Sequence, residues 1–293
     1  MIVVKLIGGL GNQMFQYAAG KALAHRHGVS LKLDVTGFDK ATEGAYTQRH
    51  FELGCFKLQT EIATEAELKR FTRFEENRWL RVAQRKMPWL FSNTFFSESG
   101  SQFHETFLKL GANTYMNGYW QSELYFNDIR KILLQDFELN ETMPKTLDHW
   151  FNKIQTINSV SMHVRRGDYV QLASANAFHG ICSELYYQNA LSKLQLDEKN
   201  VEIFVFSDDI NWCKENLKFK TKTHFVDHAE KACWDLFLMR HCKHNIIANS
   251  SFSWWAAWLN EHTNKRVFVP EYWFTNIKSD SIDILAHHWE SVK

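Results

Sequence analysis

Two adjacent arginines, Arg165 and Arg166, follow an apolar strand that the sequence predicts at 159–164. Alternation along this strand puts His163 and Arg165 on the same face. A glycine ends the strand, and Asp168 comes directly after it. A guanidinium holds a phosphate through two parallel hydrogen bonds and stays charged at any working pH. The segment therefore predicts a diphosphate-binding site, in which Asp168 orients an arginine or accepts or donates a proton. The alternative interpretation is a cluster of ion pairs at the surface.

Two later segments also place polar groups after predicted strands. Asp208 and Asp209 follow the strand 201–206, where they could contact a ribose or base or cap the next helix. Residues 249–253 (NSSFS) lie between the strand 244–248 and a helix. Amides at a helix start attract anions, and serine hydroxyls add donors. Because ligands bind outside the carboxyl ends of strands in open α/β sheets, these segments together predict a nucleoside diphosphate site.

The N-terminal residues 2–7 predict a buried strand, followed by a glycine-rich loop at 8–13 and a helix from Met14. The dinucleotide-binding pattern needs glycine where Met14 stands, so an NAD(P)-dependent oxidoreductase is a weak alternative. Asn12 and Gln13 offer neutral hydrogen-bonding groups at the mouth of this strand. Asn12 capping the helix is an equally good interpretation.

Residues 117–122 (NGYWQS) predict a strand and turn with groups that stack on sugars and bind hydroxyls. Trp120 and Gln121 are therefore candidates for contact with a sugar, although spacing alone favours a core position for Trp120. Residues 241–244 (HCKH) lack the ligands of a zinc site, so structural histidines are favoured.

Strands alternating with helices predict an α/β fold with parallel sheets. A polar stretch at 140–144 suggests two domains, 1–145 and 146–293, with the last helix expected to pack back on the first domain. The helix predicted within 61–90 mixes arginines with aromatics, which could dock on an anionic membrane, but a solvated helix with buried aromatics is favoured.

The composition is that of a globular protein and excludes several classes. The formal net charge of +1 argues against general nucleic-acid binding. The 5 cysteines contain no C-x-x-C pair, which favours a reduced compartment. No signal peptide and no run of membrane-spanning length are evident, so we expect a cytoplasmic protein, with peripheral association at the inner membrane face as an option.

Five segments of the chain together resemble glycosyltransferase family 11, the GDP-fucose-dependent α1,2-fucosyltransferases, in a bacterial form. They are GGLGNQMFQYA at 8–18, NGYWQS at 117–122, HVRRGDY at 163–169, FSDD at 206–209 and HNIIANSSFSWWAAWL at 244–259. The resemblance implies a GT-B fold, in which two Rossmann-like α/β domains face each other across a cleft. It also implies an inverting enzyme that needs no metal or other cofactor, in O-antigen or fucosylated glycan biosynthesis.

The resemblance assigns roles to individual residues. Arg165, Arg166 and Asp168 match the catalytic positions. The residues implied in donor binding are His163, Arg165, Asp208, Asp235, Ser250, Ser251, Phe252 and Ser253, with Asp235 reading the guanine edge. The residues implied on the acceptor side are Asn12, Gln13, Trp120 and Gln121.

The resulting hypothesis is transfer of L-fucose from GDP-β-L-fucose to the 2-hydroxyl of a terminal galactose, giving an α1,2 linkage. Lactose, type 1 or type 2 chains and lipid-linked glycans all fit as acceptors. The alternatives are a non-catalytic nucleotide- or glycan-binding module, and a transferase that uses another GDP-sugar or makes another linkage.

Overall fold

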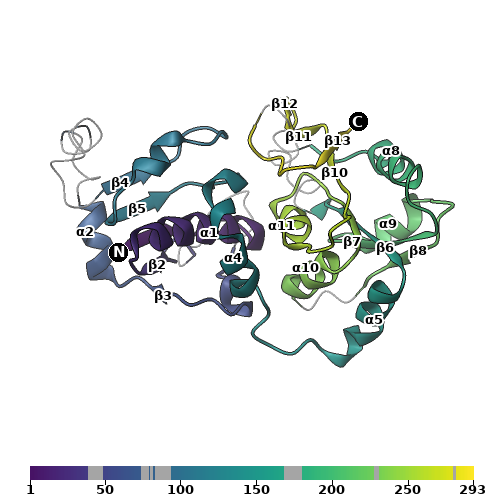
Figure 1. The fold of residues 1–293 in the computed structure, drawn as a ribbon, viewed down its shortest axis with the longest axis horizontal. Coiled ribbons are helices and arrows are strands. Elements are labelled where there is room, and N and C mark those ends of the chain that lie inside the picture. Colours follow the sequence, from purple (N-terminus) through teal and green to yellow (C-terminus); the bar gives the residue numbers. More distant parts are fainter. Residues whose placement is uncertain are drawn as a thin grey trace. The chain divides into compact units, whose positions relative to one another are not determined.

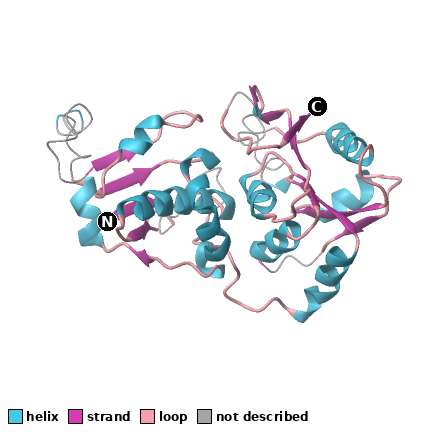
Figure 2. Ribbon diagram, viewed as in Figure 1, coloured by secondary structure: helices cyan, strands magenta, loops and turns pink. Residues whose placement is uncertain are grey.

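The computed structural model describes residues 1–38, 49–73, 79, 82, 94–167, 180–227, 231–279 and 282–293. They form two compact units, one between Met1 and Glu138 and the other between Leu139 and Lys293. The first unit thus ends a little before the boundary that the sequence suggested after residue 145. Each unit combines a parallel sheet with helices (Figures 1 and 2), so the predicted α/β class is confirmed.

The first unit is built on a parallel sheet of five strands in the order β3-β2-β1-β5-β4. Its strands are β1 (Ile2–Lys5), β2 (Leu31–Asp34), β3 (Glu61–Ile62), β4 (Thr94–Ser97) and β5 (Thr114–Asn117). Its helices are α1 (Leu10–His27), α2 (Glu65–Thr72) and α4 (Arg130–Asp136), with short 3₁₀ turns η1 (Leu53–Cys55), η3 (Glu105–Lys109), η4 (Glu123–Tyr125) and η5 (Asn127–Ile129).

Helix α1 begins earlier than the sequence indicated. Gly9 is its N-cap, in an extended conformation, and Leu10 is its first residue, whereas the hydrophobic pattern suggested Met14. The interpretation of Asn12 as the helix cap is therefore wrong, because Asn12 lies within the first turn. This early start brings the first turn of α1 to the carboxyl end of β1, where its polar side chains meet those that follow β5.

The second unit is built on a parallel sheet of six strands in the order β13-β10-β9-β6-β7-β8. Its strands are β6 (Asn158–Val164), β7 (Val201–Ser207), β8 (Thr223–Phe225), β9 (His244–Ile246), β10 (Val267–Pro270) and β13 (Glu290–Val292). A separate hairpin joins β11 (Tyr272–Phe274) to β12 (Ile277–Lys278). The helical elements are η6 (Lys145–Leu147), α5 (Asp148–Thr156), α8 (Glu184–Gln195), α9 (Ile210–Asn216), α10 (Ala232–Arg240) and α11 (Ser251–Leu259).

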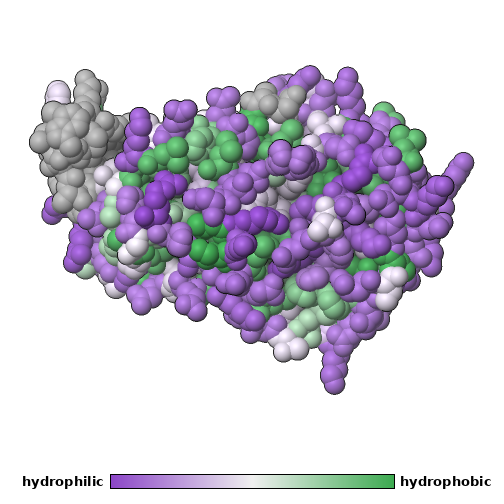
Figure 3. Space-filling model, in the orientation of Figure 1, coloured by the Kyte–Doolittle hydropathy of each residue, from purple (hydrophilic) through white to green (hydrophobic). Residues whose placement is uncertain are grey.

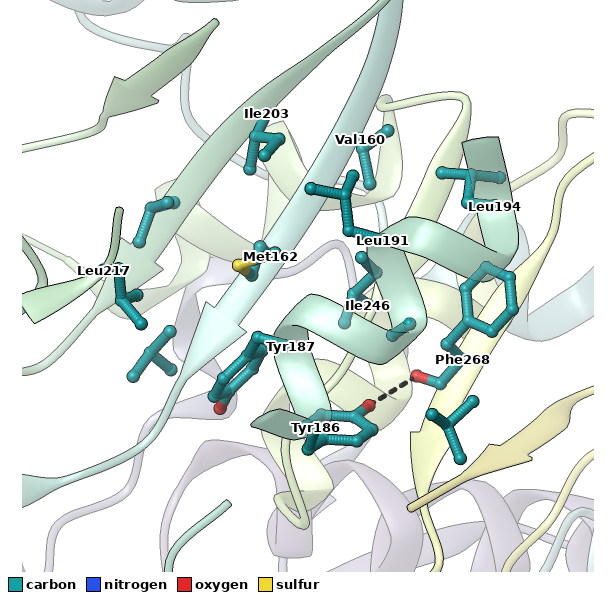
Figure 4. Packing of buried hydrophobic residues seen from close by; sticks show 14 of the residues in the cluster. Val160, Met162, Tyr186, Tyr187, Leu191, Leu194, Ile203, Leu217, Ile246 and Phe268 are labelled. Atoms are coloured by element: carbon teal, nitrogen blue, oxygen red, sulfur yellow. Dashed lines mark hydrogen bonds between the residues drawn. The ribbon is translucent and has the colours of Figure 1, made fainter. Parts of the chain in front are cut away.

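Helix α8 covers one face of this sheet (Figure 4). Val160, Met162 and Val164 of β6 all point into the resulting core, as alternation predicts. The Tyr186 hydroxyl donates to the carbonyl of Phe268 at 3.0 Å, so the polar end of this buried ring is satisfied inside the core. Apolar side chains on one face of β6 thus fix the strand that carries the arginine pair.

Two further expectations about the second unit are corrected. Helix α11 begins at Ser251, whereas the run of apolar residues suggested Trp254. A last helix was expected, but no α-helix follows α11 among the described residues: the last described element is strand β13, which pairs with β10 in the second unit's own sheet. Arg266 reinforces that pairing through Glu290, with nitrogen–oxygen distances of 2.8 and 2.9 Å.

Hydrophilic residues cover most of the described surface visible in Figure 3. No helix among the described residues is both long and apolar enough to cross a lipid bilayer. Of the segment predicted as a basic and aromatic helix, the structure describes 61–73, 79 and 82, so the proposed membrane-docking face lies mostly outside the described residues.

Candidate functional site

The predicted diphosphate segments leave one edge of the second unit's sheet. Strand β6 lies between β7 and β9, and all three run parallel. Val164 is in register with Ser207, and Met162 with Ile246. Arg165, Asp208 and the segment that leads to α11 therefore follow the carboxyl ends of neighbouring strands. This is the kind of edge where α/β folds bind ligands.

Asp208 holds the loop that carries the arginine pair. One of its oxygens lies 2.6 Å from Nη1 of Arg165, and the other accepts the backbone N–H of Arg166 at 2.8 Å. The side chains of Arg165 and Asp208 are each 25% exposed, so both remain accessible to a ligand. A Cβ at Gly167 would lie 2.6 Å from the Asp208 carboxylate, which only glycine avoids. Asp208 is thus a partner of the arginine loop, and not the cap of the next helix.

Arg166 has a different set of partners. Its Cζ lies over the Trp212 ring, 3.6 Å from the ring centroid, and its Nε is 3.5 Å from a carboxylate oxygen of Asp209. The other Asp209 oxygen accepts the backbone N–H of Trp212 at 3.2 Å and so caps α9. The two aspartates therefore divide the roles that the sequence left open, and the two arginines point their charge at different carboxylates.

The start of α11 carries the positive end of a helix dipole. Ser250 is the N-cap in an extended conformation, and the first turn contains no acidic residue. Within the described part of the chain, the Ser250 hydroxyl makes no capping hydrogen bond. Amides in the first turn of a helix lack intrahelical acceptors, so they can bind an anion. Ser250 is buried, and Ser251 and Phe252 are half-buried.

Ser253 is used differently from the other predicted serines. Its side chain is fully buried, and its hydroxyl donates to the Ser250 carbonyl at 3.3 Å. The assignment of Ser253 to donor binding is therefore wrong. Its hydroxyl is buried and stabilises the first turn of α11 from inside. Asn249 fixes the same turn from the other side by donating to the carbonyl of Trp273 at 3.2 Å.

His163 lies between the arginine loop and α11. Its ring is 5% exposed and lies 5.5 Å, centroid to centroid, from the ring of Phe252. Among the described residues, its Nδ1 has no hydrogen-bond partner. Burial lowers the pKa of His163 to about 4, more than the Asp208 carboxylate raises it, so the imidazole is neutral at pH 7. A buried, neutral nitrogen without a partner fits hydrogen bonding to a ligand at this edge.

Asp235 is the remaining candidate in the second unit. It lies on the first turn of α10, which packs against α11. Burial raises the pKa of the Asp235 carboxyl to about 7, so its charge changes near neutral pH. Asp168 lies outside the described residues, so its predicted role in orienting an arginine or moving a proton stays a prediction.

The first-unit candidates cluster at the carboxyl end of β1. Asn12 accepts a hydrogen bond from Gln121 at 2.9 Å. Gln13 is fully buried, and its amide is occupied by three backbone groups: it donates to the carbonyls of Gly8 and His50 and accepts the N–H of Glu52. Gln13 therefore braces the loop, while Asn12 and Gln121 form a polar pair.

The acceptor-contact assignment of Trp120 is wrong. Its side chain is completely buried and packs against aromatic rings of the first unit's core: Phe96, Phe107 and Tyr125. The backbone φ of Trp120 is +57°, a left-handed conformation that turns the indole inward. The interpretation as a core residue, which spacing favoured, is confirmed.

Sequence reasoning missed two residues that shape these edges. Glu98 follows β4 and accepts the backbone N–H groups of Tyr119 and Trp120 at 2.7 and 2.9 Å. Trp212 carries the stacked Arg166. No local sequence pattern predicts the contacts of Glu98 or Trp212, because their partners follow strands that are distant in sequence. No group of three or more potential metal ligands occurs among the described residues.

The chain is similar to known proteins along nearly its whole length. The model of "Glycosyl transferase family 11" matches residues 1–291. The chain is 34% identical to an alpha-1,2-colitosyltransferase from Escherichia coli, over 100% of this chain and 99% of that protein. It is 24% identical to galactoside alpha-(1,2)-fucosyltransferase 2 from Gorilla gorilla gorilla, over 98% of this chain and 82% of that protein.

The fold is also found in a solved structure. The crystal structure of NodZ alpha-1,6-fucosyltransferase soaked with GDP-fucose matches with a TM-score of 0.53 and 15% identity, over 88% of this chain and 91% of that one. This likeness identifies the two α/β units as a GT-B fold, as predicted. With a family model that spans nearly the whole sequence and bacterial and animal relatives that align along it, the chain belongs to glycosyltransferase family 11.

Proposed function

We propose that the protein transfers L-fucose from GDP-β-L-fucose to the 2-hydroxyl of a terminal galactose, with inversion and formation of an α1,2 linkage. The acceptor is a galactose-terminated oligosaccharide or lipid-linked glycan. The observation that carries this proposal is the meeting of three features at one sheet edge: the Arg165 guanidinium, the neutral His163 ring and the start of α11. Together they suit a pyrophosphate.

One carboxylate of the second unit could bind the guanine base of the donor. A carboxylate accepts two hydrogen bonds from the N1–H and 2-amino group of guanine, which no other common base offers in that pattern. Asp235 is our candidate, on the helix that packs against α11. Ser250, Ser251 and Phe252 then lie beside the diphosphate, with the first-turn amides of α11 pointing to it.

In the transfer step, the bond between fucose C1 and the phosphate oxygen breaks, and its electron pair leaves with GDP. Arg165 and the amides of α11 stabilise the negative charge that develops on the leaving oxygen. Arg166 assists through its position, because its own guanidinium is held by Asp209 and Trp212. Galactose O2 attacks C1 from the opposite face, which gives the α configuration.

The attacking hydroxyl must lose a proton as the new bond forms. We propose Asp168 as the recipient or as a brace for the arginine loop, since it is the carboxylate that follows the doublet in the chain. A largely dissociative step needs little assistance from a base, because the fucosyl centre is already strongly electrophilic. The variant Asp168→Asn tests the role of proton recipient against the role of brace for the arginine loop. Loss of a base lowers kcat at all donor concentrations.

We further propose that the reaction needs no divalent cation. Arg165 and a helix start supply positive charge where a metal would otherwise neutralise the diphosphate. Turnover should therefore stay within about twofold after treatment with EDTA and on addition of Mg²⁺. A loss of activity that Mg²⁺ restores would contradict this part of the proposal.

The similarity to a colitosyltransferase favours a second candidate donor, GDP-colitose. Colitose is L-fucose without its 3-hydroxyl. A site that hydrogen-bonds this hydroxyl discriminates strongly against the deoxy sugar, whereas a site that merely tolerates it does not. The ratio of kcat/KM for the two donors therefore decides between a fucosyl- and a colitosyltransferase.

The test of the proposal is incubation with GDP-fucose and lactose, with GDP measured over time and the product linkage determined by NMR. We expect GDP release that depends on acceptor and a trisaccharide with fucose on galactose O2. A protein that binds GDP but releases none from any sugar donor would instead be a non-catalytic nucleotide- or glycan-binding module.

A further inference from the structure

The turn after β5 is held in shape by a carboxylate that the proposed reaction does not use. Oε2 of Glu98 accepts the consecutive N–H groups of Tyr119 and Trp120, and Oε1 lies 3.3 Å from the Tyr125 hydroxyl. A Cβ on Gly118 would lie only 2.5 Å from that of Glu98, so glycine is required there. Burial raises the pKa of Glu98, although these hydrogen bonds oppose that shift.

This turn sends two neighbouring aromatic side chains in opposite directions. The left-handed backbone at Trp120 turns its indole completely into the core. Tyr119, one residue earlier, is 48% exposed. Backbone strain of this kind persists where the surroundings enforce it, and here Glu98 supplies the restraint. The consequence of the strained turn is an aromatic ring presented at the surface.

Polar groups that suit a sugar lie at the same edge of the sheet. Gln121, two residues after Tyr119, donates to Asn12 at 2.9 Å, and both residues are half-buried. Strands β1 and β5 are parallel neighbours, so Asn12 and the turn lie at the same carboxyl edge of the sheet. A half-exposed aromatic ring and neutral amides at one sheet edge match a pyranose, which has an apolar C–H face and a rim of hydroxyls.

We propose that Tyr119 is the stacking platform for the galactoside acceptor, and that Glu98 is a positioning residue that holds it there. The apolar face of the galactose lies on the Tyr119 ring, and the amide pair of Asn12 and Gln121 binds its hydroxyls. This inference rests on the proposed function, because it names where the acceptor of that reaction binds.

The test compares Tyr119→Ala and Tyr119→Phe with the wild type, using lactose as acceptor and GDP-fucose as donor. Tyr119→Ala should raise the acceptor KM about tenfold, because the stacking face is lost. It should leave the donor KM and the acceptor-independent hydrolysis of GDP-fucose unchanged, since the donor residues are in the other unit. Tyr119→Phe keeps the ring and should retain an acceptor KM close to the wild-type value.

Tyr272→Ala is the matched control, since Tyr272 is a tyrosine of the second unit with 45% exposure. It should leave the acceptor KM unchanged. Glu98→Gln should raise the acceptor KM and leave the donor KM unchanged, because its neutral amide oxygen accepts the two N–H groups more weakly than the carboxylate oxygen does. A merely structural role of Glu98 would lower kcat or protein yield without this split between the two KM values.

Binding of lactose, followed by saturation-transfer NMR, separates this inference from the proposed function. A wild type that binds lactose through a site lost in Tyr119→Ala, but transfers no sugar, would refute the function and support the inference. A wild type that transfers fucose while Tyr119→Ala keeps the normal acceptor KM would refute the inference alone. Equal effects of Tyr119→Ala and Tyr272→Ala, or no lactose binding by the wild type, would also overturn it.

Discussion

The two sheet edges of this protein use opposite chemistry on the same kind of scaffold. In the second unit, the residues that follow β6, β7 and β9 are charged or carry helix-end amides, and His163 has a buried nitrogen without a partner among the described residues. In the first unit, Asn12 and Gln121, which follow β1 and β5, form an amide pair, and Glu98 is occupied by backbone N–H groups. One edge suits an anion and the other a neutral polyol.

The largest effect should follow from a change in the charged edge. Arg165→Lys keeps the positive charge but loses the planar donor fork, so kcat/KM should fall on the order of 10²–10³-fold in a GDP-release assay. Arg166→Lys is the matched control and should cost less, because that guanidinium is stacked on Trp212 and paired with Asp209. Near-normal turnover of Arg165→Lys would remove this residue from the mechanism.

The second effect tests the close approach of the arginine loop to Asp208. In Gly167→Ala, the new Cβ would displace the Asp208 carboxylate from Arg165 and from the backbone of Arg166. We expect kcat/KM to fall by about tenfold. The control is Gly111→Ala, where an added Cβ meets no atom within 4 Å and turnover should not change. Equal activity of the two variants would show that the Asp208 contact is unimportant for turnover.

The third effect uses the raised pKa of Asp235, which is about 7. The carboxylate, and not the acid, accepts hydrogen bonds from guanine, so the donor KM should rise about tenfold between pH 8 and pH 6. Asp235→Asn should flatten this profile and raise the donor KM at pH 8. A wild-type donor KM that is constant over this range would separate Asp235 from the base.

The raised pKa of Asp235 should also affect the stability of the protein. This pKa is higher in the folded than in the unfolded state, so ionisation disfavours folding as the pH rises from about 4 to about 7. Asp235→Asn should therefore raise Tm by a few degrees at pH 8 and by nothing below pH 4. Thermal unfolding at both values measures this difference, and an equal shift at both would exclude a cause in the ionisation of Asp235.

The smallest effect compares the two edges directly. Salt screens exposed charges, so raising NaCl from 50 to 500 mM should increase the donor KM by roughly two- to fivefold. The acceptor KM should stay constant, since the groups proposed to bind the acceptor are neutral. An acceptor KM with the same salt dependence would show that charge also contributes at the first-unit edge.

The sequence predicted β1, β6, β7 and β9, because strands buried on two faces read as apolar runs bounded by glycine or polar residues. It did not predict β4, and it placed a strand and turn at 117–122, whereas β5 already ends at Asn117. It also predicted that Arg165, Asp208 and the serine segment leave adjacent strands. It placed the starts of α1 and α11 too late, since polar first turns such as Gly11-Asn12-Gln13 lack the apolar period that marks a helix.

Other features depend on contacts that no local pattern announces. The division of roles between Asp208 and Asp209 follows from an arginine loop that lies 42 and 43 residues away in the chain. The inward turn of Trp120 follows from Glu98, 22 residues earlier. Spacing shows that a polar or aromatic group is near an edge, but the neighbouring loop decides which side of the turn it faces.

The ion pair between Arg165 and Asp208 has a practical consequence for inhibition. Arg165 already has Asp208 as its counter-ion, so a simple anion such as inorganic phosphate must break an existing contact and should gain little in return. Under the proposed function, a guanine nucleotide should recover that loss through its base and ribose. Phosphate buffers should consequently be harmless to turnover, whereas GDP accumulates as a strong product inhibitor that a coupled phosphatase would relieve.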